Sequence, residues 1–305
     1  MTPSIESTTV ANHLPLLLLM AVAQSGCQAA VVDLMPDPAR TGLDGTAGPY
    51  GVAHQAFRAQ ARVTDVVRYE VSWPATADGA YDDRAGRCPV VMFVHGGFVP
   101  PDAYRWLATH VASRGYCVAS PEHALQLAIM ESDNASVVLD DLQERPRGPL
   151  ENGVGDDAVV MGHSLGGAVA TFRWVADERF DGLALLASWP ADSSDVESMT
   201  GRPSLSLIGS EDKGGEATQT AYEVYQRFPS PSWFGVVDGM NHYDWADGAS
   251  DADLASDGVP TRPQADTRRD VLRVLDTWLD AWLRDDAEAK AALEARGFPG
   301  VAEAP

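Results

Sequence analysis

Short apolar runs alternate with amphipathic segments through most of the chain. Strands are expected at residues 89–94, 116–120, 157–161, 183–187, 204–208 and 233–237, after an opening strand region at 63–73. Apolar residues at helical spacing predict helices at 102–113, 122–144, 165–176, 216–228 and 270–284. Strands that alternate with helices pair in parallel through right-handed crossovers. We therefore expect one doubly wound, mostly parallel α/β sheet with helices on both faces.

The composition narrows the possible functions. Its 44 acidic and 22 basic side chains give a net charge of −22, which repels phosphate backbones, so nucleic acid is not an expected partner. The three cysteines form no CxxC pair, and neither His110 nor His123 has a neighbour at metal-ligand spacing, so no metal site is expected. A length of 305 residues suits one large α/β domain.

The N-terminus has features of an export signal. The apolar residues 14–22 (LPLLLLMAV) have the length of a signal-peptide core but lack a basic stretch before them, and a bilayer span needs about 20 residues. Ser25-Gly26-Cys27 resembles the end of a bacterial lipoprotein signal, in which the cysteine is lipidated. We expect export, with membrane anchoring through Cys27 and a flexible tether up to Tyr50. A cytoplasmic protein with a disordered N-terminus is the alternative.

Cys88 and Cys117 each lie next to the start of an expected strand. If those strands are parallel neighbours, both thiols lie at the same edge of the sheet. A disulfide between them would close a loop of 29 residues and contribute roughly 3.5 kcal/mol on the chain-entropy model. Two buried free thiols are the alternative.

Gly162-His163-Ser164-Leu165-Gly166 fits the pattern G-x-S-x-G between an expected strand and an expected helix. A serine on so sharp a turn projects above the strand ends, and glycines on both sides allow close packing of helix and strand. We expect Ser164 to be a nucleophile. A structural glycine-rich turn is the alternative.

A serine hydroxyl is a weak nucleophile and needs a base that a carboxylate orients. His242 is the one histidine after Ser164, and because it follows the last expected strand it is the expected base. The acid should follow the preceding strand, where Glu211 and Asp212 stand. We favour Asp212, with Glu211 as the alternative.

The oxyanion formed in such a reaction needs two aimed donors. The N–H of Leu165 begins the helix after Ser164, and the loop His95-Gly96-Gly97-Phe98 follows the strand at 89–94. We expect Leu165 and Gly97 to donate, with Phe98 as the alternative to Gly97. His95 is expected to brace this loop.

Together these residues resemble the α/β-hydrolase superfamily over residues 63–283. The landmarks, in superfamily order, are FVHGG at 93–97, YRWLATHVASRG at 104–115, GHSLGG at 162–167, GSED at 209–212 and NH at 241–242. Within it the chain looks most like small, uncapped bacterial members akin to dienelactone hydrolases, chlorophyllases and polyester-cleaving cutinases. The resemblance implies hydrolysis through an acyl-enzyme without a cofactor. It also implies a single hydrolase domain at residues 51–305, after the signal and tether at 1–50.

Several expectations about the substrate cleft follow from the resemblance. Trp189 should line the substrate pocket, and we place His163 beside it. Residues 189–203 are too short for a large cap, so a deep lidded pocket is not expected. The acidic loop at 244–262 should screen one side of the cleft and disfavour anionic substrates. We interpret it as solvated, because Asp251, Asp253 and Asp257 miss the spacing of a calcium loop.

These residues predict a serine hydrolase that cleaves carboxylic esters, with small-molecule or polymeric esters as substrates. One alternative is a thioesterase, amidase or perhydrolase with the same residues. The other is a surface lipoprotein whose hydrolase fold only binds a ligand. Acyl length, polymer activity and oligomeric state do not follow from the sequence.

Overall fold

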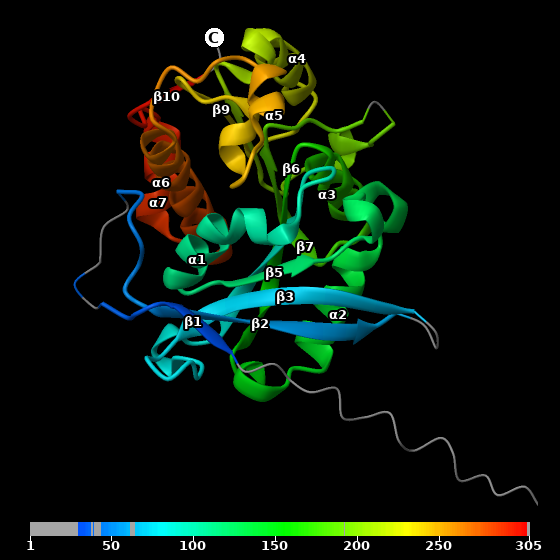
Figure 1. Cartoon of the computed structure of the whole chain (residues 1–305), viewed down its shortest axis with the longest axis vertical. Coiled ribbons are helices and arrows are strands. Elements are labelled where there is room, and N and C mark those ends of the chain that lie inside the picture. The colour runs from blue at the N-terminus through cyan, green and yellow to red at the C-terminus, as the bar shows by residue number, and fades with distance from the viewer. Residues whose placement is uncertain (1–29, 38, 40–43, 62–64, 192, 304–305) are drawn as a thin grey trace, which may run out of the picture.

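A single mixed sheet forms the centre of the protein (Figure 1). The computed structural model describes residues 30–37, 39, 44–61, 65–191 and 193–303. In these residues ten strands lie in the order β1-β2-β3-β5-β4-β6-β7-β8-β9-β10. The strands from β5 to β9 in this order pair in parallel, whereas β1, β2, β3 and β10 pair antiparallel. The strands are β1 Val31–Leu34, β2 Gly51–Gln60, β3 Val66–Ala75, β4 Cys88–Val94, β5 Cys117–Pro121, β6 Val154–His163, β7 Phe180–Leu186, β8 Ser204–Gly209, β9 Ser232–Val237 and β10 Val301–Glu303.

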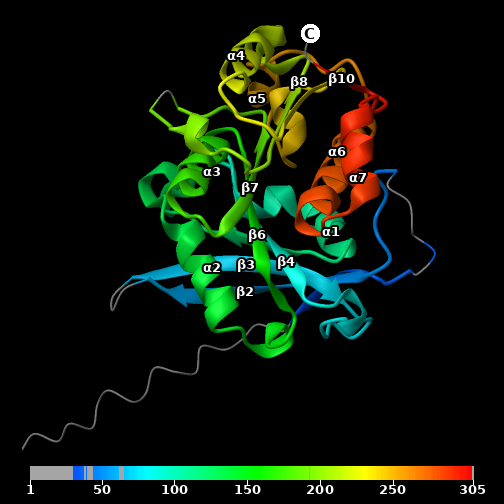
Figure 2. The same cartoon turned by 180° about the vertical axis from the view of Figure 1, so that it is seen from behind.

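Helices cover both faces of this sheet (Figures 1 and 2). Side chains alternate along a strand, so Val91 and Phe93 of β4 pack with α1 and α6, whereas Val90 and Met92 pack with α2 and α3. No described helix is both long and apolar enough to cross a bilayer. The helices are α1 Arg105–Ser113, α2 Asn134–Glu144, α3 Leu165–Ala176, α4 Glu216–Tyr225, α5 Asp251–Ala255, α6 Gln264–Leu283 and α7 Ala287–Ala295.

The register of the parallel strands brings four loops to one edge of the sheet. Val94 at the end of β4 pairs with Gly162, and His163 at the end of β6 pairs with Leu186. On the other side, Gly209 at the end of β8 pairs with Val237 at the end of β9. Because these carboxyl ends are level, the loops that follow β4, β6, β8 and β9 meet above the same edge, where open α/β sheets bind ligands.

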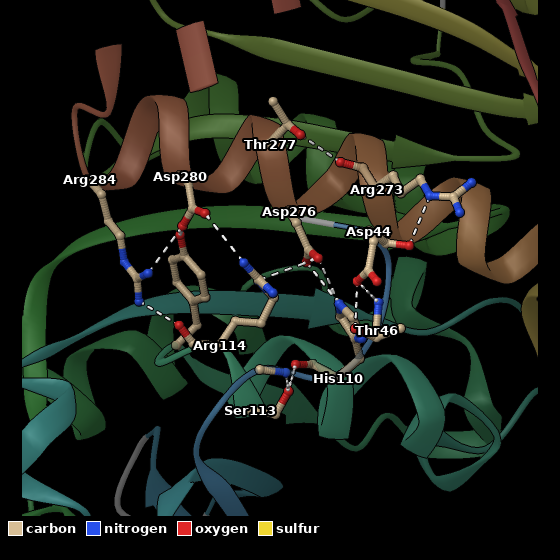
Figure 3. Close-up of polar contacts among 12 residues, drawn as sticks. Asp44, Thr46, His110, Ser113, Arg114, Arg273, Asp276, Thr277, Asp280 and Arg284 are labelled. Carbon is tan, nitrogen blue, oxygen red and sulfur yellow. Dashed lines mark hydrogen bonds and ion pairs between the residues drawn. The ribbon is translucent and has the colours of Figure 1, made fainter. Parts of the chain in front are cut away.

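Polar side chains join α6 to α1 and to the turn between α1 and β5 (Figure 3). Both carboxylate oxygens of Asp276 lie 2.9 Å from His110 Nε2, and Arg114 Nε lies 3.4 Å from one of them. Asp280 accepts a hydrogen bond from the Tyr116 hydroxyl at 2.5 Å. Burial raises the pKa of Asp276, and the nearby His110 and Arg114 oppose that rise. The carboxylates are thus buried together with partners, which buried charges require.

The segment expected to be a flexible tether is partly built into the fold. Residues 31–34 form β1, which pairs with β2. Ser113 Oγ accepts the Gly48 N–H at 2.7 Å, and Arg273 Nε donates to the Asp44 carbonyl at 2.8 Å (Figure 3). The tether prediction is wrong for these residues because their backbone groups find partners on the sheet, α1 and α6. The apolar stretch at 14–22 and Cys27 lie outside the described residues.

The helix expected at 122–144 begins only at Asn134. Two short 3₁₀ helices, Ala124–Gln126 and Ala128–Glu131, come before it, and Leu125 and Gln126 have φ of 54° and 56°. Left-handed backbone interrupts an α-helix. The Gln126 carbonyl accepts the Phe98 N–H at 2.9 Å, so a tertiary contact to the loop after β4 accompanies this turn.

The sequence patterns also did not predict β1, β2, β10, α5 and α7, and β6 begins earlier than expected, at Val154.

Cys88 and Cys117 are joined by a disulfide, with their Cα atoms 5.5 Å apart. They begin β4 and β5, which are parallel neighbours in the sheet. Of the two alternatives that the sequence left open, the structure has the bridge.

Candidate active site

Ser164 occupies a strained turn between β6 and α3. Its φ of 53° and ψ of −126° place a residue other than glycine in a sparsely populated region. The turn is too tight for side chains on both sides. A Cβ at Gly162 would lie 2.3 Å from the Gly166 carbonyl oxygen, and one at Gly166 would lie 2.2 Å from that of Val94. The two glycines of the motif are therefore required by close backbone contacts.

Hydrogen bonds hold the strained residue on both sides. The Ser164 N–H donates to the Leu186 carbonyl at 3.0 Å. Its carbonyl accepts from the Gly167 N–H at 2.9 Å and from Ser188 Oγ at 2.6 Å. A Cβ at Gly167 would lie 2.4 Å from Ser188 Oγ, so the two residues are in close contact. Ser188 could not be recognised from the sequence, since a serine after a strand has no distinguishing pattern.

Ser164, His242 and Asp212 form a hydrogen-bonded chain. Ser164 Oγ lies 2.9 Å from His242 Nε2, and His242 Nδ1 lies 2.9 Å from Asp212 Oδ2. Asp212 is 1% exposed, whereas 21% of the His242 side chain is exposed. A buried carboxylate on Nδ1 requires that nitrogen to carry a proton, which leaves Nε2 to accept the hydroxyl proton of Ser164.

The acid loop and the base loop are fixed to each other by their backbones. The Ser210 N–H donates to the Val237 carbonyl and the Glu211 N–H donates to the Met240 carbonyl, each at 2.9 Å. The side-chain carboxylate of Glu211 accepts a hydrogen bond from Ser210 Oγ at 3.0 Å and, within the described part of the chain, forms none with His242. Asp212, the favoured candidate, is therefore the carboxylate that reaches His242, whereas the Glu211 carboxylate binds Ser210.

Two backbone N–H groups beside Ser164 remain available for an oxyanion. Within the described residues, the N–H groups of Gly97 and Leu165 donate to no protein atom. A Cβ at Gly97 would lie 3.2 Å from Leu165 Cδ2, so these two residues are adjacent. The Phe98 N–H does not meet this requirement, because it donates to the Gln126 carbonyl and Phe98 has φ of 61°. The alternative of Phe98 as donor is therefore wrong for this conformation.

A pair of buried histidines supports the loop that carries Gly97. His95 Nδ1 lies 2.9 Å from the Gly96 carbonyl, and His95 Nε2 lies 2.9 Å from His123 Nδ1. A carbonyl only accepts, so His95 Nδ1 must donate, and its Nε2 then accepts from His123. Burial lowers the pKa of His95, and burial together with His95 lowers the pKa of His123 to about 3. Both rings are therefore neutral near pH 7, and His95 braces the loop as expected.

His163 does not line an open pocket, contrary to the prediction. It is 3% exposed, and its ring packs against that of His242, with the two ring centroids 4.8 Å apart. The Tyr104 hydroxyl accepts the Gly96 N–H at 3.1 Å and lies 2.8 Å from His163 Nδ1, to which its proton is directed. Burial, with a smaller effect of His242, holds the pKa of His163 well below its usual range. His163 is a neutral packing residue, and Tyr104 was predicted only as an apolar helix position.

The surface around Ser164 carries exposed apolar side chains. Phe98 is 73% exposed and Leu125 is 77% exposed, and their segments are joined by the bond from Phe98 to Gln126. On the acid-loop side, Trp189 is half-buried, with Lys213 Nζ 6.0 Å from its ring centroid. Lys213 directly follows Asp212, so Trp189 stays a predicted pocket residue. No group of side chains suited to hold a metal ion occurs among the described residues.

The fold and this site define an α/β protein with a serine on a sharp turn at the carboxyl edge of a parallel sheet. A model of the alpha/beta hydrolase family matches residues 90–256, more than half of the chain. The chain belongs to the alpha/beta hydrolase family, which confirms the predicted superfamily and fold. Among curated proteins, none matches the chain. Membership supports a hydrolase of a general kind, and the closer resemblance to dienelactone hydrolases, chlorophyllases and cutinases stays a prediction.

Proposed function

We propose that this protein is a serine hydrolase that cleaves carboxylic esters through an acyl-enzyme intermediate. One observation carries the proposal. Ser164, His242 and Asp212 are linked by two hydrogen bonds of 2.9 Å beside the N–H groups of Gly97 and Leu165. A nucleophile, a base, an orienting acid and two oxyanion donors are the parts that acyl transfer requires.

In the proposed reaction, Ser164 Oγ attacks the ester carbonyl carbon while His242 Nε2 takes the hydroxyl proton. The negative charge that develops on the carbonyl oxygen is stabilised by the N–H groups of Gly97 and Leu165. His242 then returns the proton to the leaving alcohol, which leaves Ser164 acylated. A water then attacks the acyl carbon and gives a proton to His242. The bond from the acyl carbon to Ser164 Oγ breaks, His242 returns the proton to Oγ and the acid is released, and Asp212 stabilises the imidazolium in both steps.

Replacement of Ser164 tests the mechanism. Ser164→Ala should lower kcat on p-nitrophenyl butyrate by about 10⁴ or more and abolish labelling by a fluorophosphonate probe. Ser198→Ala is a matched control, since among the described residues Ser198 Oγ bonds the Asp195 carbonyl alone, in an exposed turn. It should turn over and label like the wild type. Turnover that survives in Ser164→Ala, or a wild type that does not label, contradicts the proposal.

The bond type is tested with substrates that share one acyl group. We expect the kcat/KM of the ester to exceed that of the matched thioester and amide. A higher kcat/KM on the thioester or the amide would show that the same residues serve a thioesterase or an amidase and not an esterase.

The exposed apolar side chains support esters with an apolar acyl or alcohol part. Phe98 belongs to the proposed oxyanion loop, Leu125 belongs to the turn bound to it, and both side chains are largely exposed. Phe98→Ser should therefore lower kcat/KM for a hexanoate ester several-fold and leave that for an acetate ester nearly unchanged, because contact with a longer chain buries more apolar area.

Export is part of this proposal, with a lipid anchor at Cys27. The disulfide between Cys88 and Cys117 supports it, since disulfides persist in oxidising compartments. Protein purified from its native host without reductant should show no free thiol at these two positions, and Cys27 should carry lipid. Free thiols at both positions would favour a cytoplasmic protein.

A further inference from the structure

The loop after the proposed base contacts both loops of the site through one carboxylate. Asp257 Oδ2 accepts a hydrogen bond from the His242 backbone N–H at 2.7 Å. Its Oδ1 accepts one from the Lys213 N–H at 2.5 Å. Lys213 directly follows Asp212 in the chain. One side chain therefore bridges the acid loop and the base loop next to their reactive residues.

The residues around Asp257 fit closely against the same two loops. We call residues 257–261 the clasp. Asn241 Nδ2 donates to the Gly258 carbonyl at 2.9 Å, and the Thr261 N–H donates to the Gly239 carbonyl at 3.0 Å. A Cβ at Gly258 would lie 1.9 Å from the Glu211 carbonyl oxygen, so no side chain fits there without movement. The clasp thus contacts the acid loop through Asp257 and Gly258, and the base loop through Asp257, Gly258 and Thr261.

The chemistry of these contacts favours a fixed geometry. Bonds from backbone N–H groups to an ionised carboxylate are about twice as strong as neutral hydrogen bonds. Lys213 has φ of 47°, a strained conformation for a residue other than glycine, and its N–H is one of the two donors. Small displacements of catalytic groups are costly, since about 1 Å can lower a rate 10²-fold. The separation of Asp212 and His242 depends on both loops that Asp257 joins.

We propose that Asp257 is a positioning residue that sets the distance between Asp212 and His242 by binding the backbone N–H beside each of them. The interpretation of this loop as solvated is wrong for the Asp257 carboxylate, which binds two backbone N–H groups. The inference rests on the proposed function, because its main consequence is read through turnover at Ser164.

Replacement of the carboxylate is the direct test. Asp257→Ala should lower kcat by at least about tenfold while KM changes less than about twofold, because the clasp holds the acid and base and not the substrate. Asp257→Asn should fall between the wild type and Asp257→Ala. Its amide offers one acceptor oxygen, and its NH₂ group faces the second backbone N–H, which also donates.

Asp253 provides a matched control in the same loop. Its Oδ2 accepts from the Ser250 N–H at 2.9 Å and from Ser250 Oγ at 2.6 Å, which caps α5. Asp253→Ala removes the same charge from the loop without touching the acid or base loop. Its kcat should stay within about twofold of the wild type.

Gly258→Ala tests the same idea without removal of the carboxylate. The added Cβ collides with the Glu211 carbonyl and must push the clasp away from the acid loop. We expect a loss of kcat similar to that of Asp257→Ala, again with little change in KM.

A proton NMR spectrum gives a readout that does not require turnover. The proton shared by Asp212 and His242 should resonate far downfield in the wild type and in Asp253→Ala, and should be broadened or lost in Asp257→Ala. If Asp257→Ala does not fold, Asp257→Asn carries both measurements. The proposal is wrong if both Asp257 variants keep wild-type kcat and the resonance, or if Asp253→Ala loses as much as Asp257→Ala. A wild type without turnover would end the proposed function, whereas the resonance would still decide the role of the clasp.

Discussion

Two buried aspartates in this protein each hold a histidine at the same distance, with different consequences. Asp212 Oδ2 lies 2.9 Å from His242 Nδ1, and the Asp276 oxygens lie 2.9 Å from His110 Nε2. Both aspartates are 1% exposed, but 21% of the His242 side chain is exposed against 6% of His110. The pair itself is therefore not what distinguishes a candidate active site.

The surroundings of the two pairs make the difference. His242 presents its second nitrogen to Ser164 at the carboxyl edge of the sheet, where a substrate can approach. Asp276 of α6 faces His110 of α1, and the Arg114 guanidinium is a second partner 3.4 Å away (Figure 3). In the first pair the buried charge is available to stabilise an imidazolium during a reaction. In the second pair it is compensated by fixed partners and joins two helices.

Amide substitution of the two aspartates is the strongest test of this comparison. Asp212→Asn should lower kcat by about 10³ to 10⁴, because the amide can impose the wrong tautomer on His242. Asp276→Asn should leave kcat per folded molecule within about twofold. Ester turnover corrected for the folded fraction measures both. Equal losses of kcat would show that the two pairs are not functionally distinct.

Truncation of the two aspartates to alanine should affect stability in the opposite order to kcat, with the larger loss at Asp276. Asp276→Ala leaves Arg114 and His110 buried without their carboxylate, and the free energy of unfolding should fall by about 3 to 5 kcal/mol. Asp212→Ala removes a buried carboxylate whose partner His242 is partly exposed to water, and it should change stability by less than about 1 kcal/mol. Urea unfolding at about pH 7 compares them. A larger loss in Asp212→Ala would contradict this assignment.

Low pH should destabilise the protein through three histidines near the candidate site, His95, His123 and His163, which among the described residues bond no carboxylate. His95, His123 and His163 have folded-state pKa values below the unfolded value of about 6.5. The unfolded chain then binds more protons, so the free energy of unfolding decreases as the pH falls below about 6.5. For His123, whose folded-state pKa is about 3, the decrease is about 1.4 kcal/mol per pH unit down to that value, and His95 and His163 act in the same direction. Urea unfolding at several pH values measures the slope.

His123→Asn provides the control for that titration. The asparagine amide keeps a donor for His95 Nε2 but does not titrate. The variant should therefore lose stability less steeply in acid than the wild type. Parallel pH dependences would exclude His123 as a contributor.

Removal of one tyrosine hydroxyl from each of the two regions should give the smallest effects on kcat and the most selective comparison. Tyr104→Phe removes the bond to His163 Nδ1 beside the site and should lower kcat a few-fold, with about 1 kcal/mol of stability lost. Tyr116→Phe removes the bond to Asp280 in the other network and should cost about 1.5 to 3 kcal/mol without an effect on kcat. Turnover and thermal unfolding of both variants decide the matter. A loss of kcat in Tyr116→Phe would couple the two regions.

Much of the arrangement at the sheet edge could be predicted from local pattern. G-x-S-x-G between a buried strand and a helix permits few backbone conformations, and the chain order of serine, acid and histidine then leaves His242 as the one candidate base. Asp212 could be preferred over Glu211 but not fixed, because the direction of a side chain in a tight turn depends on which backbone groups bind the loop. One such group is the Met240 carbonyl, far along the chain, which accepts the Glu211 N–H.

Other features had no local signal. Asp257 stands among several acidic residues, and only its contacts with Lys213 and His242 distinguish it. The turn at Leu125 and Gln126 lies within a helix-like pattern and is tied to Phe98 by a bond between distant segments. His163 could be located from the motif, but its ring packs against His242 and bonds Tyr104, which is far from it in the chain.

The sequence by itself determined the alternation of strands and helices, the glycines that a serine turn needs and the chain order of the reactive side chains. These are properties of neighbouring residues, where steric limits and hydrophobic period act directly. Tertiary structure decided which aspartate faces a nucleophile, which histidines are buried and neutral, and which carboxylate joins two loops. Those outcomes depend on burial and hydrogen bonds between residues far apart in the chain, and no local pattern encodes them.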